Sequence, residues 1–235
     1  ISYSDETVKR FARLKPAAPD FRIFWDNAYS IHHLYDDDQD VIPELLTECE
    51  KVGTEDMVYK FISTSKVSFP GSGIAAMAAS EANLNDARKW MHYQTIGHDK
   101  LNQLRHVRFF KDMDGMHEHM RKHAAILRPK FELVQKTLEE GLGGLEIGSW
   151  TKPKGGYFIS FDSLDGCAKR IVSMAKEAGL VLTGAGATYP YGKDPKDCNI
   201  RIAPSFPTLE ELGKAAELFV ICVKLASAEK LLGEE

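Results

Sequence analysis

The stretch VYKFISTSKVSFPGSGIAAMAAS, residues 58–80, decides the fold expected for this chain. Its first six residues are mostly aromatic or β-branched, which predicts a buried strand over Val58–Ser63. A turn rich in hydroxyls and glycines follows, and it carries a single lysine, Lys66. The apolar run that begins at Ile74 predicts a helix. A strand, a turn and a helix in this order indicate an α/β domain.

The segment before this stretch predicts a second strand and a helix. The apolar run Phe21–Trp25 favours a buried strand, and Pro43–Val52 favours a helix with proline in its first turn. Two strands separated by a helix make a parallel β-α-β unit. The acidic run at 36–40 lacks the spacing and the glycine turn of a calcium loop, so we expect a solvated loop.

The segment after it predicts mostly helices and then a small mixed sheet. Residues 86–142 show apolar side chains at helical spacing, including Leu101, Leu104 and Val107. Strands and helices then alternate, which indicates a smaller α+β region. The expected elements are strands at Tyr157–Phe161, Leu180–Leu182 and Ile200–Ala203, and helices at Ser163–Ala178 and Thr208–Ala226.

Composition excludes several classes of function. The chain has 235 residues, 43% of them hydrophobic, and a net charge of −4, which gives no electrostatic footprint for nucleic acid or an anionic membrane. No apolar run approaches the ~20 residues that span a bilayer. Four scattered cysteines without a C-x-x-C pair favour free thiols in a reducing cytoplasm. The chain begins at Ile1 without a methionine or a signal peptide, so we expect it to be part of a longer protein.

Lys66 is the first candidate for chemistry. A lysine in a turn is most simply a surface residue, but this one lies among groups that suit a phosphorylated cofactor. Hydroxyls and free backbone N–H groups bind phosphate, and an amine that readily loses its proton forms a Schiff base. We therefore predict that Lys66 holds pyridoxal 5′-phosphate (PLP). The surrounding hydroxyls and glycines are Ser63, Ser65, Ser72, Gly71 and Gly73.

A dinucleotide site is the rival interpretation of the same glycines. Gly71, Gly73 and Ala76 are spaced as in a dinucleotide-binding fingerprint between a strand and a helix. The turn is long, however, and Pro70 precedes it. No acidic residue ends a strand about 20 residues further on, as that fingerprint requires. These differences disfavour a dinucleotide.

Three further residues suit a PLP site. Asp26 follows the first strand, where a carboxylate faces the ligand crevice of α/β proteins and could keep the pyridine nitrogen protonated. Tyr29 could donate a hydrogen bond to the phenolic oxygen of the ring. Arg201 interrupts a short apolar strand, and its planar fork suits a substrate carboxylate. Without these roles, Asp26 would cap a turn and Arg201 would pair with a buried acid.

The histidines suggest no separate site. His117, His119 and His123 fall on a predicted helix without an H-E-x-x-H motif, so we expect a solvated helix face. His32 and His33 are expected in a plain loop. The chain has no G-x-S-x-G elbow and no Walker lysine motif.

The strings WDNAYSIHHL (25–34), FISTSKVSFPGSGIA (61–75), TIGHDKLNQLRH (95–106), KPKGGYFISFD (152–162) and NIRIAPSFP (199–207) together resemble fold-type I PLP-dependent aminotransferases. They look like the aspartate aminotransferase branch sometimes called MocR-like. The likeness covers essentially the whole chain, as the C-terminal part of such an enzyme. It implies an α/β fold in which residues 1–104 end the PLP-binding large domain, a mostly parallel sheet with helices. Residues 105–235 would form the small α+β domain.

The resemblance also implies a role for each site residue. Lys66 becomes the Schiff-base lysine and Asp26 the partner of the pyridinium, while Tyr29 binds the phenolic oxygen. Arg201 becomes the clamp on the substrate α-carboxylate. Ser63 and Ser65 become phosphate ligands, and Thr95 with Gly97 would reach the phosphate of a second subunit in a homodimer. Ser72 is a further candidate cofactor ligand on its hydroxyl chemistry alone.

Two features depart from the family pattern. Many relatives carry Pro-Gly-x-Arg after the lysine, with the arginine on the phosphate, whereas Gly73 stands in that place here. The glycine-rich phosphate cup and the aromatic residue that stacks on the ring would lie upstream of Ile1. We therefore expect the chain alone to be inactive.

The resemblance implies an aminotransferase, and the composition adds the expectation of a cytoplasmic enzyme with no nucleic-acid, membrane or metal partner. It would move an amino group between an L-amino acid, aspartate in the first instance, and a 2-oxo acid by a ping-pong Schiff-base mechanism. Two alternatives stay open. The chain could be the effector domain of a MocR-type transcription regulator, or a PLP lyase or decarboxylase.

Overall fold

The computed structural model describes residues 2–233, and its contacts divide the chain into two compact units. The first unit comprises Ser2–His33 and Asp38–Lys122. The second comprises Leu34–Asp37 and the chain from His123 onward. The division falls inside one long helix, later than the boundary expected from the sequence between residues 104 and 105.

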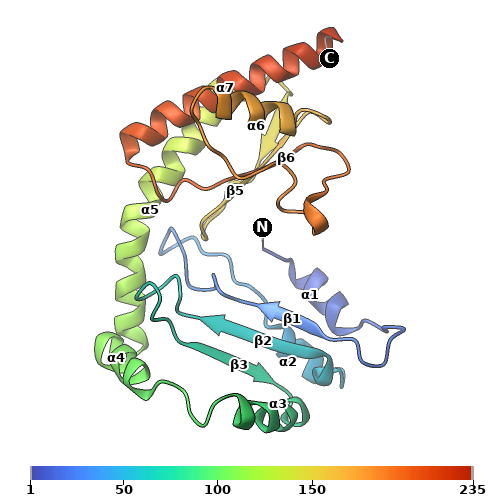
Figure 1. Ribbon diagram of the computed structural model, residues 1–235, viewed down its shortest axis with the longest axis vertical. Helices are drawn as coiled ribbons and strands as arrows, with labels where there is room; N and C mark the ends of the chain where they lie inside the picture. Colours follow the sequence, from blue (N-terminus) through green and yellow to red (C-terminus); the bar gives the residue numbers. More distant parts are fainter. Residues whose placement is uncertain (1, 234–235) are drawn as a thin grey trace. The chain divides into compact units, whose positions relative to one another are not determined.

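The first unit is a three-stranded sheet with helices, and its strands run in the order β1-β2-β3 (Figure 1). The expected β-α-β unit is present, since β1 and β2 are parallel and paired from Ile23↔Val58 to Asp26↔Phe61. The elements are α1 (Asp5–Ala12), β1 (Ile23–Asp26), α2 (Leu45–Glu50), a 3₁₀ turn (Glu55–Met57), β2 (Val58–Ser63), β3 (Ala75–Ala79), α3 (Glu81–Gln94) and α4 (Lys100–Phe110).

The core of this unit lies between α1, α2 and one face of the sheet. Trp25 on β1 and Val58 on β2 point to this face and pack with the helices. Phe24 points to the opposite face, where its ring lies 5.7 Å from the ring of Phe61 and is 72% exposed. One sheet face is therefore covered by the described residues and the other is open. The helix residues of the core are Val8, Ala12, Leu45 and Cys49.

The helix expected at Ile74 is wrong, because Ala75–Ala79 forms strand β3. Alanine favours helices over strands as an isolated residue, so local propensity indicated a helix. The antiparallel ladder from Tyr59↔Ala79 to Ser63↔Ala75 satisfies the backbone groups of both strands, and this tertiary pairing outweighs the propensity. The dinucleotide fingerprint also requires a helix here, so the structure removes that rival.

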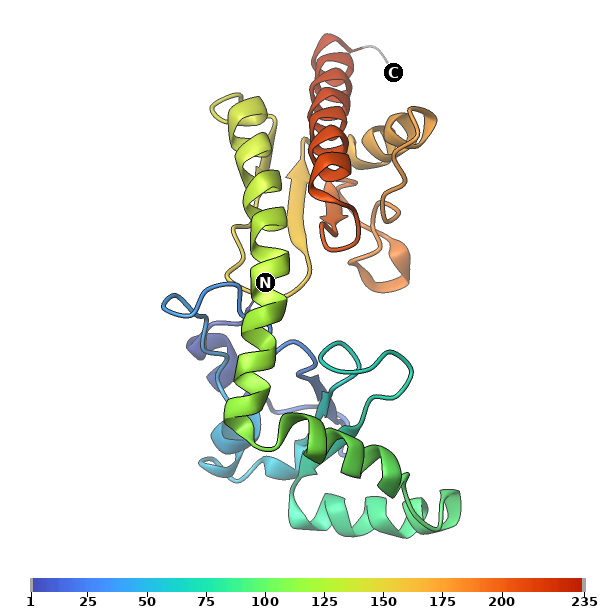
Figure 2. The same cartoon turned by 90° about the vertical axis from the view of Figure 1, so that its left-hand side faces the viewer.

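The second unit packs a three-stranded antiparallel sheet, in the order β4-β5-β6, against three helices. Figure 2 shows the C-terminal half of α5 and α7 side by side, and a Cβ atom on Gly141 of α5 would lie 2.6 Å from Cγ1 of Val220 on α7. The elements are α5 (Met113–Leu142), β4 (Gly148–Trp150), β5 (Ile159–Ser163), α6 (Ala168–Glu177), a 3₁₀ turn (Pro190–Gly192), β6 (Asn199–Ile202) and α7 (Leu209–Leu232).

The strand expected over Leu180–Leu182 is absent, because these residues pair with no other strand. Their apolar side chains instead line a hydrophobic cavity together with side chains of α5 and α7. The helix expected from Thr208 is confirmed, and Thr208 with Glu211 forms a capping box at its start. The largest fully buried side chains of this unit include Phe131, Leu138, Ile159, Phe161 and Ile171.

The acidic residues at 36–40 are exposed, as expected of a solvated loop. The four cysteines are buried free thiols. Within residues 2–233, no cluster of histidine, cysteine, aspartate and glutamate could hold a metal ion. No helix over the same residues is long and apolar enough to cross a membrane.

Candidate active site

Lys66 lies in a tight turn directly after β2, with its side chain exposed. Two backbone hydrogen bonds close the turn, from N–H of Val67 (2.9 Å) and of Ser68 (3.0 Å) to the carbonyl oxygen of Thr64. Val67 is 1% exposed and anchors the turn in the unit. The backbone therefore points the lysine outward at the carboxyl end of the central strand.

Tyr29 and Lys66, which the sequence placed in one site, are in contact. The Nζ atom of Lys66 lies 5.1 Å from the centroid of the Tyr29 ring. Asp26 ends the neighbouring strand β1, and its Oδ1 accepts a hydrogen bond of 3.2 Å from the N–H of Ala28. Asp26 thus caps a turn, and a carboxylate has further lone pairs for another donor.

Ser63 and Ser65 also lie together, on either side of Thr64. Their Oγ atoms are 2.7 Å apart, and the N–H of Ser65 donates to Oγ of Ser63 at 3.0 Å. Among the described contacts, those of Ser72 and Thr95 go to other groups. The N–H of Ser72 bonds the carbonyl of Phe69 at 3.1 Å, while the Thr95 hydroxyl donates to the carbonyl of Gly97 at 2.7 Å.

Gly73 packs directly against Ser65. A Cβ atom at position 73 would lie 2.9 Å from Oγ of Ser65 and 3.0 Å from its Cα and N atoms. These distances are shorter than almost all real Cβ contacts, and two of the three atoms belong to the backbone, so a side chain at position 73 would push against the backbone beside Lys66. The structure thus gives a physical reason for a glycine at position 73.

His106 and Asn102 support this turn from α4, and the sequence analysis missed both. The Nδ1 atom of His106 donates to the carbonyl of Asn102 at 2.8 Å. Its Nε2 lies 2.6 Å from Oγ of Ser68 and 3.1 Å from Oγ1 of Thr64. Asn102 donates from Nδ2 to the carbonyl of Ser72 at 2.7 Å. Asn102 and His106 are four residues apart and therefore lie on one face of the helix, different from that of Leu101 and Val107. This spacing was the signal in the sequence that could have identified them.

His119 and His32 also contact the turn that carries Lys66. Nε2 of His119 donates to the carbonyl of Val67 at 2.7 Å, so the solvated helix face expected for His119 is wrong. His32 is 3% exposed, and its Nε2 donates to the carbonyl of Lys66 at 3.1 Å. Burial lowers the pKa of His32 below its ordinary value. Two hydrogen bonds with the backbone act to raise this pKa, but the charge of Lys66 lowers it further, and the net shift is downward.

Arg201 lies on β6 of the second unit, opposite Ser160 on β5. Its guanidinium stacks on the ring of Phe158, with Cζ 4.4 Å from the centroid. Its Nε is buried and has no hydrogen-bond partner among the described residues. A buried guanidinium N–H without an acceptor is costly. The arrangement therefore suits an incoming carboxylate.

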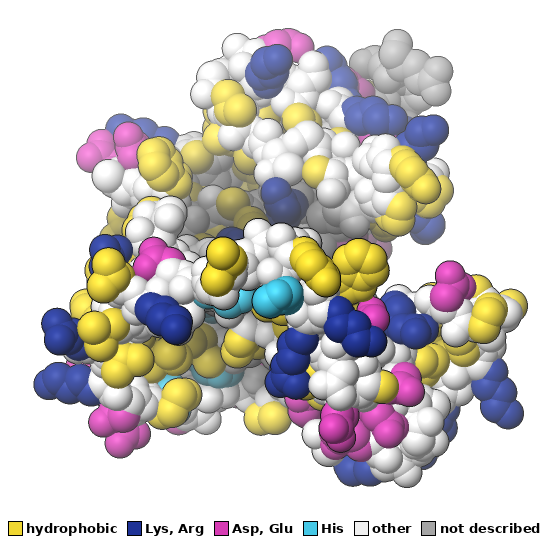
Figure 3. Space-filling view, turned by 60° about the horizontal axis from the view of Figure 1, so that its bottom comes forward, with side chains coloured by type: hydrophobic (Ala, Val, Ile, Leu, Met, Phe, Trp, Pro, Cys, Tyr) yellow, Lys and Arg dark blue, Asp and Glu magenta, His cyan; other side chains and the backbone are white. Residues whose placement is uncertain are grey.

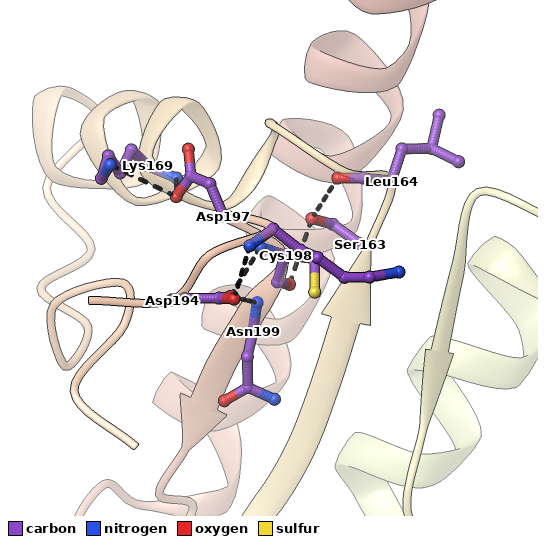
Figure 4. Close-up of polar contacts among 8 residues, drawn as sticks. Ser163, Leu164, Lys169, Asp194, Asp197, Cys198 and Asn199 are labelled. Carbon is purple, nitrogen blue, oxygen red and sulfur yellow. Dashed lines mark hydrogen bonds and ion pairs between the residues drawn. The ribbon is translucent and has the colours of Figure 1, made fainter. Parts of the chain in front are cut away.

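A polar network fixes the strand that carries Arg201 (Figure 4). The Asp194 carboxylate accepts hydrogen bonds of 2.8 Å from the N–H groups of both Cys198 and Asn199. Burial alone would raise the pKa of Asp194, but these bonds and a third from Lys196 lower it to about 2. Asn199 in turn donates to Oδ1 of Asp162 at 2.7 Å, which ties β6 to β5.

The whole chain matches a known family. The family model described as aspartate amino-transferase matches residues 1–235. The chain belongs to the aspartate aminotransferase family. The resemblance inferred from the sequence motifs is thereby confirmed as that of a fold-type I PLP-dependent aminotransferase, and the mixed α/β class expected for its C-terminal portion is confirmed too.

Individual relatives show how much of an aminotransferase this chain represents. A protein from Mycolicibacterium smegmatis is 44% identical over 234 residues, which are 100% of this chain and 54% of that protein. An aspartate aminotransferase from Corynebacterium glutamicum is 43% identical over 97% of this chain and 53% of its own length. The crystal structure of an aspartate transaminase from Corynebacterium glutamicum superposes with a TM-score of 0.93 at 41% identity, covering 97% of this chain and 53% of that one. The chain thus spans about half the length of the curated relatives it matches.

Proposed function

We propose that the complete natural protein is a PLP-dependent aminotransferase that moves an amino group between an L-amino acid and a 2-oxo acid. Aspartate is the first candidate donor, because the Corynebacterium glutamicum relative carries that name. The observation that carries the proposal is the placement of Lys66, an amine 5.1 Å from the Tyr29 ring at the carboxyl end of the central strand. In an α/β sheet this edge is where ligands bind.

The residues around Lys66 fit PLP by their chemistry. Lys66 would attach the cofactor, and Asp26, at the end of the adjacent strand, would hold the proton on its pyridine nitrogen. Ser63 and Ser65 present two hydroxyls 2.7 Å apart, which suits a phosphate. The Tyr29 hydroxyl would donate to the phenolic oxygen. Ser72 and Thr95 remain candidate ligands, although their described contacts do not link them to the residues around Lys66.

The chain's own residues then account for the proton transfers of the reaction. PLP supplies an electron sink when bound. Lys66 would act at Nζ as general base and acid, taking a proton from the substrate Cα and returning it to the carbon on the far side of the amino nitrogen. Arg201 would bind the substrate α-carboxylate through its planar fork. The second half-reaction uses the same groups in reverse, which gives ping-pong kinetics.

We also propose a cytoplasmic homodimer. The four buried free thiols favour a reducing compartment. Hydrophobic side chains stay exposed on α3, α4 and the segment between them. Figure 3 shows in yellow the hydrophobic side chains that are exposed on the side it views. Trp90 is 67% exposed and Leu101 79% exposed. Apolar surface of this kind suits a second copy, which Thr95 would approach. Sedimentation of the complete protein at twice the monomer mass is the expected result.

A lysine variant tests the proposed activity. We expect Lys66→Ala in the complete natural protein to lose the absorbance of lysine-bound PLP, and turnover to fall by at least roughly 10²–10⁴-fold, because the base is gone. Lys176→Ala, which removes an exposed lysine on α6, is the matched control and keeps both. Native absorbance and native turnover in Lys66→Ala would refute the proposal. A 2-oxo acid as product, with no loss of carboxylate or side chain, distinguishes transfer from lyase or decarboxylase chemistry.

A further inference from the structure

The turn that carries Lys66 does not supply hydrogen-bond donors to all of its own backbone carbonyl groups. Both of its internal backbone bonds end on the carbonyl of Thr64, so the carbonyls of Lys66 and Val67 need donors from elsewhere. Each carbonyl receives one from a histidine: His32 donates to Lys66 and His119 to Val67. The two histidines come from different segments, the loop after Tyr29 and helix α5.

A third histidine holds the hydroxyl side of the same turn. His106 is 2% exposed, and its Nε2 lies within hydrogen-bond distance of the hydroxyls of Thr64 and Ser68. Thr64 is also the point where the turn meets the return strand, since its Oγ1 accepts from the N–H of Ile74 at 2.9 Å. A shift of His106 would therefore move both arms of the connection between β2 and β3.

We propose that His32, His106 and His119 form a histidine bracket that positions Lys66, and that His106 is its central member. The three rings touch the turn at Lys66 O, Val67 O and the Thr64 and Ser68 hydroxyls. The ring of His32 also packs against the ring of Tyr29, with the two ring centroids 5.5 Å apart. The bracket thus couples the lysine to the tyrosine that contacts its amine, and its members act through the turn rather than on the substrate.

The chain offers a matched pair of variants for His106. In His106→Asn the short amide can still donate to the Asn102 carbonyl, as Nδ1 does, but it cannot reach the turn. In His106→Gln the longer amide oxygen can still accept from Ser68 or Thr64, as Nε2 does. The pair therefore separates the contact with the turn from the contact within α4. His92→Gln, on the exposed surface of α3, controls for the loss of a histidine.

The first measurement is the rate at which apoprotein attaches added PLP, followed by absorbance, and it rests on the proposed function. A displacement of up to an ångström at a reacting group costs up to about 10²-fold in rate. We expect His106→Asn to slow attachment by roughly tenfold or more, and to lower kcat with little change in KM. We expect His106→Gln and His92→Gln to stay within about threefold of the native protein.

The second measurement needs no cofactor. Amide hydrogen exchange at Val67 and Ser68 reports whether their bonds to Thr64 O still hold. We expect exchange at least about tenfold faster in His106→Asn than in His106→Gln at equal Tm. Native exchange in His106→Asn, or equal acceleration in both variants that follows the loss of Tm, would overturn the inference. Failure of native protein to attach PLP would instead refute the proposed function and leave the exchange result to decide the bracket.

Discussion

Gly73→Ala tests whether the close approach of two backbone segments sets the position of Lys66. The new Cβ atom would lie 3.0 Å from Cα and N of Ser65, about 0.4 Å inside the 3.4 Å at which ordinary contact begins. Because two of the three crowded atoms belong to the backbone, a change of rotamer cannot relieve them. Overpacking of this kind costs about 1–3 kcal/mol. At about 2–4 °C per kcal/mol, the Tm should fall by several degrees.

The same substitution should also affect chemistry, because the displaced residue adjoins Lys66. We expect PLP attachment to slow by roughly tenfold, from a displacement of about half an ångström. Gly184→Ala is the control, since a Cβ atom at Gly184 meets nothing within 4 Å. Differential scanning calorimetry and the absorbance assay of PLP attachment are run on the complete protein. Gly73→Ala with the native Tm and the native attachment rate would refute the account of this turn.

Three further predictions concern the second unit. Arg201→Lys keeps the charge but loses the planar fork, so the KM for the amino acid should rise roughly tenfold while the Tm is unchanged; an unaltered KM counts against a carboxylate clamp. The lowered pKa of Asp194 means that its contribution to stability is complete above its ordinary pKa of 3.8 and is lost as pH falls through about 2. Asp194→Asn should therefore flatten the stability–pH curve in that window, as measured by urea unfolding, and an unchanged slope contradicts the assignment. Gly141→Ala should cost about 1–3 kcal/mol in denaturant unfolding, because its Cβ would lie 2.6 Å from Cγ1 of Val220, yet leave PLP attachment intact; no loss of stability would show that α5 and α7 separate easily.

Much of the fold could be predicted where local signals and tertiary packing agree. The apolar runs of β1 and β2 with a helix between them required a parallel β-α-β unit, and the structure has it. The start of α7 could be predicted because Thr208 and Glu211 satisfy each other and the helix end without help from elsewhere. Such features depend on residues close in sequence, so sequence reasoning finds them.

The errors occur where a distant partner decides the structure. Ala75–Ala79 is a strand because β2 pairs with it, and alanine itself carries no signal for that pairing. Leu180–Leu182 looks like a strand by its apolar residues, but these side chains line a cavity and find no ladder partner. On α4 the apolar stripe that includes Val107 is exposed, whereas His106 is buried. A helical period in the sequence shows that the helix has an apolar face, but it does not show which face packs against the rest of the protein.

In the candidate site, too, some contacts could be predicted from the sequence and others could not. The contact of Lys66 with Tyr29 could be expected, because both follow adjacent parallel strands at their carboxyl ends. The contact of His106 with Ser68 depends on how α4 docks, 38 residues further along the chain. No short motif contains that information. The missing arginine could be noticed from the sequence, but the close approach of Gly73 to Ser65 required coordinates.

Chemical trapping tests the central claim most directly. The complete protein is incubated with PLP, reduced with borohydride and digested, and the modified lysine is located by peptide mass spectrometry. Reduction converts the lysine–cofactor linkage into a stable amine, so the mass of the reduced cofactor marks the residue that carried it. The account predicts stoichiometric label on the peptide that contains Lys66. Label on another lysine, or no label above that of a sample without PLP, would contradict it.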